Sequence, residues 1–244
     1  MFTESKHGDQ GDWCGVLGLT ITVKFTGMNL WEYIEDRWDL IVFETVQHAS
    51  MVAQCVLVAT VLGVLVGVAT YRRPRPSAFA TAVAGVLFTI PSLAMLGLLI
   101  PPLGLGVAPS VTAIVLYALL PIIRNTVVGL RGVDPALVDA ARGIGMSRHR
   151  SLTRVELSLA WPVILTGIRV ATQLAMGIAA VAAYVSGPGL GEQIFSGLAR
   201  LGGANAVNST LTGTIGVAIL ALLFDGCFVL LGKLTTPGTG AVRG

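Results

Sequence analysis

Charged residues are scarce in this sequence. Asp, Glu, Lys and Arg make up 12% of the 244 residues, whereas apolar residues make up 54%, and the mean hydropathy is +0.79. Soluble domains carry about 25% charged residues, roughly twice this fraction. The composition therefore excludes an ordinary soluble enzyme or binding domain and indicates a membrane protein.

Residues that carry catalytic chemistry are also few. The three cysteines and three histidines are far apart along the chain, so neither a metal site nor a disulfide framework is predicted. There is no GxxxxGK[ST] phosphate loop and no nucleophile elbow. The GPGLGE sequence at 187–192 has the wrong spacing for a dinucleotide fingerprint. We predict that the chain is not an enzyme and holds no cofactor or metal of its own.

The apolar residues are gathered in five long runs. A helix needs about 20 such residues to cross the bilayer core, and the runs do not alternate as barrel strands do. The sequence predicts an all-α membrane protein with five transmembrane helices. These are placed near residues 51–70, 77–100, 107–123, 159–186 and 211–231.

The basic residues predict the orientation. With five spans, eleven of the sixteen Lys and Arg residues follow the first, third or fifth span, four lie on the other side and one lies inside a span. Positively charged loops stay in the cytoplasm. We therefore predict a multi-pass membrane protein with its amino terminus outside and its carboxyl terminus in the cytoplasm.

The amino-terminal region divides at residue 28. Residues 1–27 show no secretory signal, because Lys24 interrupts a short apolar patch, and we interpret them as a mis-assigned start or a disordered extension. From Met28 an amphipathic helix is predicted to lie on the outer membrane surface before the first span. Its apolar positions are Leu30, Ile34, Trp38, Ile41 and Val42. The transport domain is expected at 28–238, followed by a tail at 239–244.

Two charges, Arg169 and Asp225, fall inside the fourth and fifth spans. At a rise of about 1.5 Å per residue they lie roughly 15 Å and 9 Å from the cytoplasmic boundary. An unpaired charge at such depth costs at least about 2.5–3.5 kcal/mol. We predict that they pair, within one chain or between two. The alternatives are that each faces a wet cavity, or that Asp225 is protonated.

A polar stretch between the third and fourth spans reads as two short helices. Asp134 followed by Pro135 is a typical helix start. Gly143 and Gly145 allow a sharp turn, after which Ser147 can cap a second helix that ends at Leu157. Small side chains at Ala140, Ala141 and Gly145 would permit close approach by another backbone. The alternative is a plain topology loop, but such a loop needs only charges, so a docking element is favoured.

This stretch resembles a known loop. The pattern D-A-A-x-x-x-G, followed nine residues later by V-x-L, is similar to the E-A-A-x-x-x-G-x9-I-x-L-P loop of ABC importer permeases. In that family the loop forms a coupling helix that fits a cleft on the ATP-hydrolysing subunit. The matching positions are Asp139, Ala140, Ala141, Gly145, Val155 and Leu157. Aspartate replaces the glutamate, and Ser158 stands in the place of the proline.

Further stretches at 88–106, 116–145, 167–198 and 232–238 resemble permeases of osmoprotectant importers, which carry glycine betaine, choline, carnitine and related quaternary amines. The resemblance implies the type I ABC importer permease fold over 28–238, with the polar stretch as its cytoplasmic coupling-helix loop. It implies a separate ATP-binding subunit that holds ATP and Mg²⁺, an extracytoplasmic substrate-binding protein, and a second permease copy, identical or closely related. It implies a multi-pass protein of the bacterial inner or plasma membrane, surrounded by lipid, and no nucleic-acid partner is expected.

Several residues within the spans are candidates for a pathway or gate. Pro91 and Pro121 each free a backbone carbonyl, and Tyr117 and Tyr184 lie within or at the ends of spans. Routine bundle packing and interfacial anchoring are the alternatives. The GVLVG sequence at 63–67 presents two glycines four residues apart, a face suited to close helix packing.

Other functions remain open at this point. The chain could serve an importer of another small zwitterion or of an amino acid. It could also be a stand-alone carrier driven by an ion gradient, with Arg169 and Asp225 as its coupling sites. A membrane anchor is a third possibility, although proline-interrupted spans would then be superfluous.

Overall fold

The computed structural model describes residues 28–235, so the predictions for the extension at 1–27 and the tail at 239–244 lie outside the described residues. Within the described range every regular element is a helix. The elements are α1 (Leu30–Asp36), α2 (Trp38–Thr70), α3 (Pro74–Thr89), α4 (Ser92–Leu103), α5 (Val107–Arg131), α6 (Pro135–Gly143), α7 (Arg148–Ser151), the π-helical η1 (Leu152–Glu156), α8 (Leu157–Ala182), the 3₁₀ helix η2 (Ala183–Val185), α9 (Gly191–Ala199) and α10 (Ala206–Thr235).

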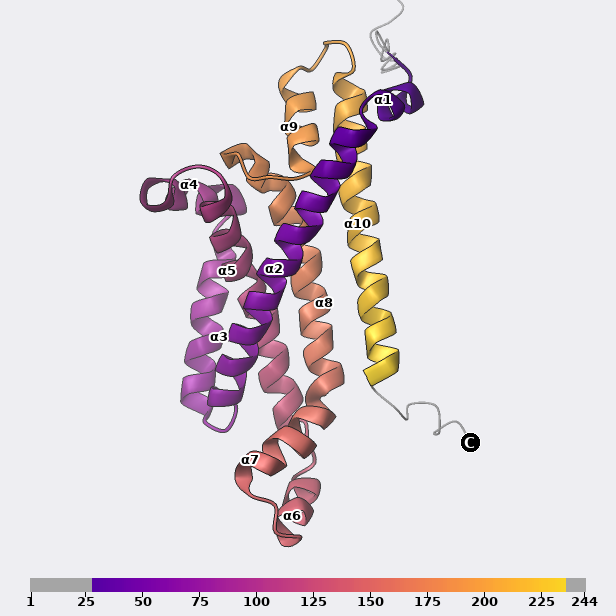
Figure 1. Ribbon diagram of the computed structural model, residues 1–244. Coiled ribbons are helices and arrows are strands. Elements are labelled where there is room, and N and C mark those ends of the chain that lie inside the picture. Colours follow the sequence, from indigo (N-terminus) through magenta and orange to yellow (C-terminus); the bar gives the residue numbers. More distant parts are fainter. Residues whose placement is uncertain (1–27, 236–244) are drawn as a thin grey trace, which may run out of the picture.

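The long helices form a bundle around α5 and α8. Between residues 28 and 235, four helical stretches are long and apolar enough to cross a membrane, and the bent pair α3–α4 raises the number to as many as five. The predicted all-α architecture is thus confirmed, although the helices run past the apolar runs, which mark only the hydrocarbon-spanning part. In Figure 1, α6 and α7 project from one end of the bundle, here called the hairpin end, while α1, α4 and α9 lie at the opposite end.

Glycines allow a close helix contact between α2 and α5. A Cβ at Gly63 would lie 2.7 Å from Cγ2 of Ile122, and one at Gly67 would lie 2.5 Å from Cγ2 of Thr126. Both distances are too short for a real side chain, so α2 can approach α5 this closely only with glycine at both positions. The predicted packing role of the GVLVG sequence is confirmed.

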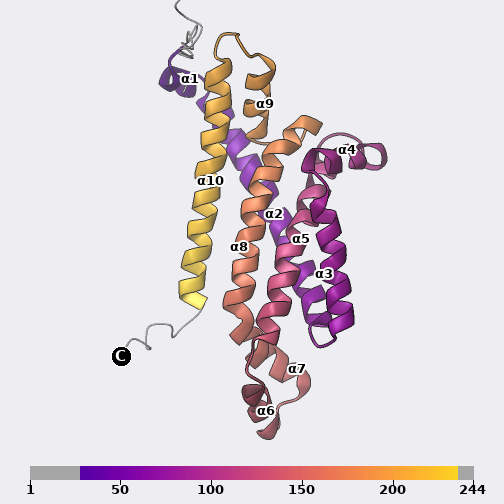
Figure 2. The same ribbon diagram turned by 180° about the vertical axis from the view of Figure 1, so that it is seen from behind.

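The second predicted span is not one helix. It is divided after Thr89, and α3 and α4 meet at an angle of 96°. Pro91 causes the division, because proline removes an amide donor and holds the residue before it in an extended conformation; Ile90 has ψ 128°. α4 therefore projects sideways from the end of the bundle, beside α3 and α5 (Figure 2), and the prediction of a continuous helix over 77–100 is wrong. By contrast, α5 continues through Pro121.

Tyr117 supports this bend. Its side chain is buried, its ring packs edge-on against Phe88, and its hydroxyl donates a hydrogen bond to the carbonyl of Ile90. The structure thus places this candidate pathway residue at the α3–α4 corner, where it satisfies a carbonyl that no helical amide reaches.

Tyr117→Phe is expected to destabilise the folded protein by about 1–3 kcal/mol, the usual cost of an unsatisfied buried polar group. Thermal unfolding of the purified protein in lipid nanodiscs measures the effect. Tyr184→Phe is the matched control, since the Tyr184 side chain is 70% exposed. Equal unfolding midpoints for the two variants would contradict the role of the Ile90 bond.

The amino-terminal helix also differs from its prediction. α1 starts with a capping box between Asn29 and Glu32 and ends at Asp36. A second helix, α2, begins at Trp38 and continues into the span. The prediction of one long amphipathic helix that lies on the membrane surface is therefore wrong. The physical reason is that Glu44 and His48 are buried against the bundle, so the first turns of α2 belong to the packed structure.

Candidate functional site

The polar segment between α5 and α8 forms a helical hairpin that stands beyond the bundle (Figure 1). Its first helix, α6, begins as predicted: the Asp134 carboxylate accepts a hydrogen bond of 2.9 Å from the Ala136 amide, and Pro135 occupies the first helical position. Ser147 caps α7 more loosely, by accepting from the Arg150 amide at 3.4 Å. The sequence therefore determines both arms of the hairpin through local caps.

Gly145 determines the turn. Its φ is +85°, and two hydrogen bonds close the end of α6: the Met146 amide donates to the Ala141 carbonyl at 3.1 Å, and the Gly145 amide donates to Arg142 at 2.9 Å. This is the Schellman arrangement, which favours glycine at the left-handed position. A Cβ on Gly145 would meet nothing within 4 Å. Backbone conformation, not lack of space, thus accounts for this glycine within the chain.

The hairpin presents apolar side chains outward. Ile144 is 75% exposed and Leu137 is 48% exposed, and Ala140 is also exposed. Ala141 faces the interior of the hairpin and is buried, so it does not belong to the outer small-residue surface that the sequence suggested. Asp139 is exposed and forms a long ion pair of 3.5 Å with Arg142. We call Leu137, Ala140 and Ile144 the hairpin tip.

The second arm is continuous with the following span, which the sequence did not predict. Helical structure runs from Arg148 to Val185, and η1 contains a π-type bond from the Leu157 amide to the Leu152 carbonyl. π-helical turns are rare and recur at functional sites. Val155 and Leu157 are half-buried. The prediction of a hairpin helix that ends at Leu157 and is separate from the fourth span is therefore wrong.

Replacing Gly145 tests the turn. Gly145→Val should distort the hairpin, because a β-branched residue in the left-handed region costs on the order of 1–3 kcal/mol. The resemblance of this loop to that of importer permeases predicts reduced uptake per inserted chain at unchanged membrane levels. Gly145→Asn is the control, since asparagine tolerates this conformation and should retain most of the activity. Similar losses in both variants would show that side-chain volume matters instead.

Glu156 is a site residue that sequence reasoning missed. It lies between Val155 and Leu157 and is only 4% exposed. Its carboxylate accepts hydrogen bonds from the Tyr71 hydroxyl at 2.5 Å and from Arg72 at 2.8 Å, and Arg72 follows the end of α2. No local signal in the sequence identifies partners some 85 residues away.

Arg169 and Asp225 meet within one chain. The Arg169 guanidinium donates three hydrogen bonds of 2.8–3.0 Å to the Asp225 carboxylate, which joins α8 to α10. The predicted pairing is confirmed, and the form within a single chain is the one observed. Two neutral contacts lie on either side: Gln173 donates to the Ala221 carbonyl, and Trp161 donates to Thr235.

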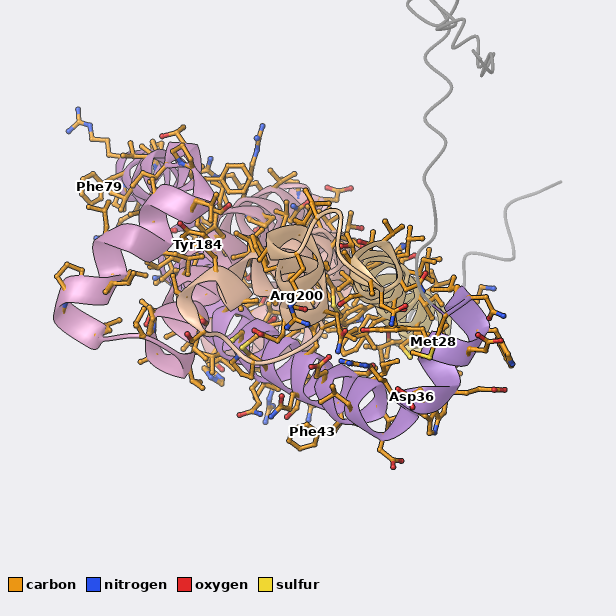
Figure 3. All side chains as sticks on the ribbon, turned by 90° about the horizontal axis from the view of Figure 1, so that it is seen from above. Met28, Asp36, Phe43, Phe79, Tyr184 and Arg200 are labelled. Atoms are coloured by element: carbon orange, nitrogen blue, oxygen red, sulfur yellow. The ribbon has the colours of Figure 1, made fainter. Side chains whose placement is uncertain are left out.

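At the opposite end of the bundle, α9 and the start of α10 pack against α1 and α2. Gln193 accepts hydrogen bonds from Tyr33 and Ser209, and Figure 3 shows Arg200 above this region and Tyr184 nearer α3. A pocket of about 220 Å³ opens here, lined partly by Glu44 and Arg200. Gly189 has a φ of +120° and touches His48, so the GPGLG corner packs on α2.

The four candidate pathway residues thus separate in space. Pro91 and Tyr117 build the α3–α4 corner, Pro121 is buried inside α5, and Tyr184 is exposed at the end opposite the hairpin, where its ring lies beside Phe195. Whether any of them lines a pathway stays a prediction.

Comparison with known proteins agrees with this architecture. Residues 59–236 match the family described as "Binding-protein-dependent transport system inner membrane component". The carnitine transport permease protein OpuCB of Listeria monocytogenes is 36% identical over 83% of this chain and 89% of its own length. The choline transport system permease protein OpuBB of Bacillus subtilis is 34% identical over 84% and 93%. The osmoprotectant import permease protein OsmW of Salmonella typhimurium is 36% identical over 86% and 98%.

Solved structures share the fold at lower identity. A chain of the MetNI methionine ABC transporter, determined in inward-facing conformations, superposes with a TM-score of 0.73 at 20% identity and covers 83% of this chain and 99% of that chain. A chain of an amino acid ABC transporter crystallised with histidines gives 0.60 at 15% identity, with 85% and 97% covered. The type I importer fold and the family expected from the D-A-A-x-x-x-G loop are confirmed. The chain belongs to the family of binding-protein-dependent transport system inner membrane components, the membrane permease subunits of ABC transporters.

Proposed function

We propose that the chain is the permease subunit of an ATP-driven importer for osmoprotectants of the quaternary-amine class, such as glycine betaine, carnitine or choline. The observation that carries the ATP-driven part is the capped hairpin, whose apolar tip stands clear of the bundle with Ile144 75% exposed. Exposed apolar groups of this kind mark interaction sites. The substrate class is supported by three relatives at 34–36% identity, whose names include carnitine, choline and osmoprotectant.

The hairpin is assigned to an ATP-binding subunit on the cytoplasmic side. Asp139 and the hairpin tip would meet that subunit directly, while Ala141, Gly145, Val155 and Leu157 would hold the hairpin in shape. ATP and Mg²⁺ would be held by the partner. The arginines near this end support a cytoplasmic location for the hairpin and the carboxyl terminus, and an outer location for the amino terminus.

Two permease copies are assigned to each transporter, because one chain supplies one hairpin and an ATPase pair offers two docking places. The α10 helix supports this arrangement, since only 6% of its most apolar 18-residue stretch is buried within the chain. A substrate-binding protein would deliver the substrate at the opposite end. Closure of the ATPase pair on ATP would draw the two hairpins together and turn the membrane cavity outward.

The ion-coupled carrier receives no support from the charged pair. Arg169 and Asp225 satisfy each other through three hydrogen bonds, which leaves little capacity for a coupling ion. Transport of an amino acid rests on structures at 15–20% identity, and these concern the fold alone.

Reconstitution tests the proposal. The permease, co-expressed with its ATPase and purified into proteoliposomes with the binding protein, should accumulate labelled glycine betaine, carnitine or choline only when ATP is supplied. Competition among the three compounds and unlabelled amino acids identifies the substrate class. Uptake by the permease alone under an ion gradient, without ATP, would overturn the proposal.

A further inference from the structure

The hairpin has two roots, and both are bonded to the same corner of the bundle. Arg131, the last residue of α5, donates from Nε to the Tyr71 carbonyl at 2.8 Å. Glu156, the last residue before α8, accepts from the Tyr71 hydroxyl at 2.5 Å and from Arg72 at 2.8 Å. Tyr71 and Arg72 join α2 to α3. We call Tyr71, Arg72, Arg131 and Glu156 the root clamp.

The chemistry of the root clamp makes it stiff. Both carboxylate oxygens of Glu156 have a partner, and the side chain is 5% exposed. Arg72 also donates to the Tyr71 hydroxyl, and its guanidinium lies 5.2 Å from the centre of the Tyr71 ring. Burial raises the pKa of Tyr71 to about 12, so the phenol keeps its proton and remains a donor. Charge-assisted hydrogen bonds to a buried carboxylate are strong, and loss of one partner leaves a charge unsatisfied.

The centre of the root clamp, Tyr71 and Glu156, is not part of the docking surface, whereas Arg72 and Arg131 are exposed beside it. Glu156 and Tyr71 are buried within the chain, so a partner subunit cannot reach them without unfolding the roots. Nor is the clamp needed to form the hairpin, whose caps and turn are local to residues 134–150. Its position fits a connection between the hairpin and the rest of the bundle.

We propose that the root clamp transmits displacement of the hairpin to α2 and α3, and that Glu156 is a positioning residue for coupling ATP hydrolysis to transport. α8 continues from the second arm of the hairpin without a break, and α5 leads into the first arm. α2 and α3 pack on the sides of α5, and in the described residues the hydrogen bonds of this corner join them to the hairpin roots. When the hairpin moves, the clamp makes α2 and α3 move with it. Without the clamp the hairpin still moves with the ATPase, but less of its displacement reaches α2 and α3. The inference rests on the proposed function, since it requires a hairpin that an ATPase moves.

The test is the number of substrate molecules imported per ATP hydrolysed by the complete complex in proteoliposomes. We expect Glu156→Gln and Arg72→Met each to lower this ratio at least about fivefold while ATP hydrolysis stays within about twofold of the unmodified complex. The double variant should lose no more than the worse single variant, since residues that act through one contact are not additive. Tyr71→Phe, which removes one donor and keeps the ring, supplies a milder variant if the others assemble poorly.

Arg154→Met is the matched control, because Arg154 lies two residues from Glu156 in η1 and is exposed; its ratio should not change. A merely structural role would lower complex yield, ATP hydrolysis and uptake in the same proportion and leave the ratio constant. A constant ratio in Glu156→Gln, Arg72→Met and Tyr71→Phe overturns the inference. Absence of ATP-dependent uptake in the unmodified complex would instead overturn the proposed function.

Discussion

Glutamate in place of Ile144 is expected to abolish most ATP-driven uptake while the permease stays in the membrane. Ile144 has the most exposed large side chain of the hairpin tip. It follows α6 directly, so the closing hydrogen bonds of that helix hold it in place. A carboxylate there would have to be buried in an apolar contact without a partner. Loss of an anchor residue at an interface costs about 2 kcal/mol or more, and every 1.4 kcal/mol is about a tenfold change in affinity.

Two control variants separate docking from folding. Ile144→Met keeps an apolar side chain of similar volume and should retain ATPase binding. Leu105→Glu makes the same change at a residue that is 65% exposed at the opposite end of the bundle, and it should also leave ATPase binding intact. Co-purification of the ATPase with each variant, together with uptake, gives the readout. Normal ATPase binding by Ile144→Glu would show that the hairpin tip does not lie in the interface with the ATPase.

The hairpin could be predicted in detail because its structure is local. A capping carboxylate, a proline at the first helical position and a glycine with positive φ act within a few residues. These signals fix where α6 begins and ends in any surroundings. What local signals cannot supply is the direction of each side chain, and Ala141 therefore proved to face inward.

The spans were predictable as apolar runs, but their breaks were not. The length of an apolar run does not predict whether a proline inside it breaks the helix. Pro91 divides two helices that meet at 96°, whereas α5 continues through Pro121. The outcome depends on neighbours: Tyr117 supplies a donor to the free carbonyl of Ile90 and so stabilises the bend. Tertiary contacts also decide where α2 begins, because Glu44 and His48 face the bundle.

The two ionic contacts, Arg169–Asp225 and Arg72–Glu156, show where sequence reasoning succeeds and where it fails. Arg169 and Asp225 are conspicuous because each is an isolated charge in an apolar run, and their depths follow from helix geometry. Glu156 follows a run of polar residues at the end of a hairpin, so nothing in the sequence separates it from a solvated charge. Only the folded chain brings it to Tyr71 and Arg72.

Removal of one member of the Arg169–Asp225 pair is expected to lower the stability of the folded protein and the insertion of α10 strongly. The pair is about one-third exposed in the isolated chain. The start of α10 is held by hydrogen bonds to α9, whereas toward the hairpin end the other hydrogen bonds between α10 and α8 in the described residues are two neutral ones. An unpaired Asp or Arg near the middle of a membrane helix costs about 2.5–3.5 kcal/mol. Arg169→Leu and Asp225→Leu should each lower the unfolding midpoint and the amount of α10 correctly inserted.

The double variant decides whether the pair acts as a unit. Two leucines leave no unpaired charge, and apolar replacements of buried ion pairs are often neutral or stabilising. Arg169→Leu/Asp225→Leu should therefore be more stable than either single variant, although uptake need not recover. Gln173→Leu is the control one turn away on α8; it removes one neutral hydrogen bond and should cost only about 1 kcal/mol. Thermal unfolding and protease protection of all four variants in nanodiscs measure the coupling. If the losses of the two single variants add in the double variant, with a coupling below about 0.5 kcal/mol, the residues act independently and the contact contributes nothing to the attachment of α10.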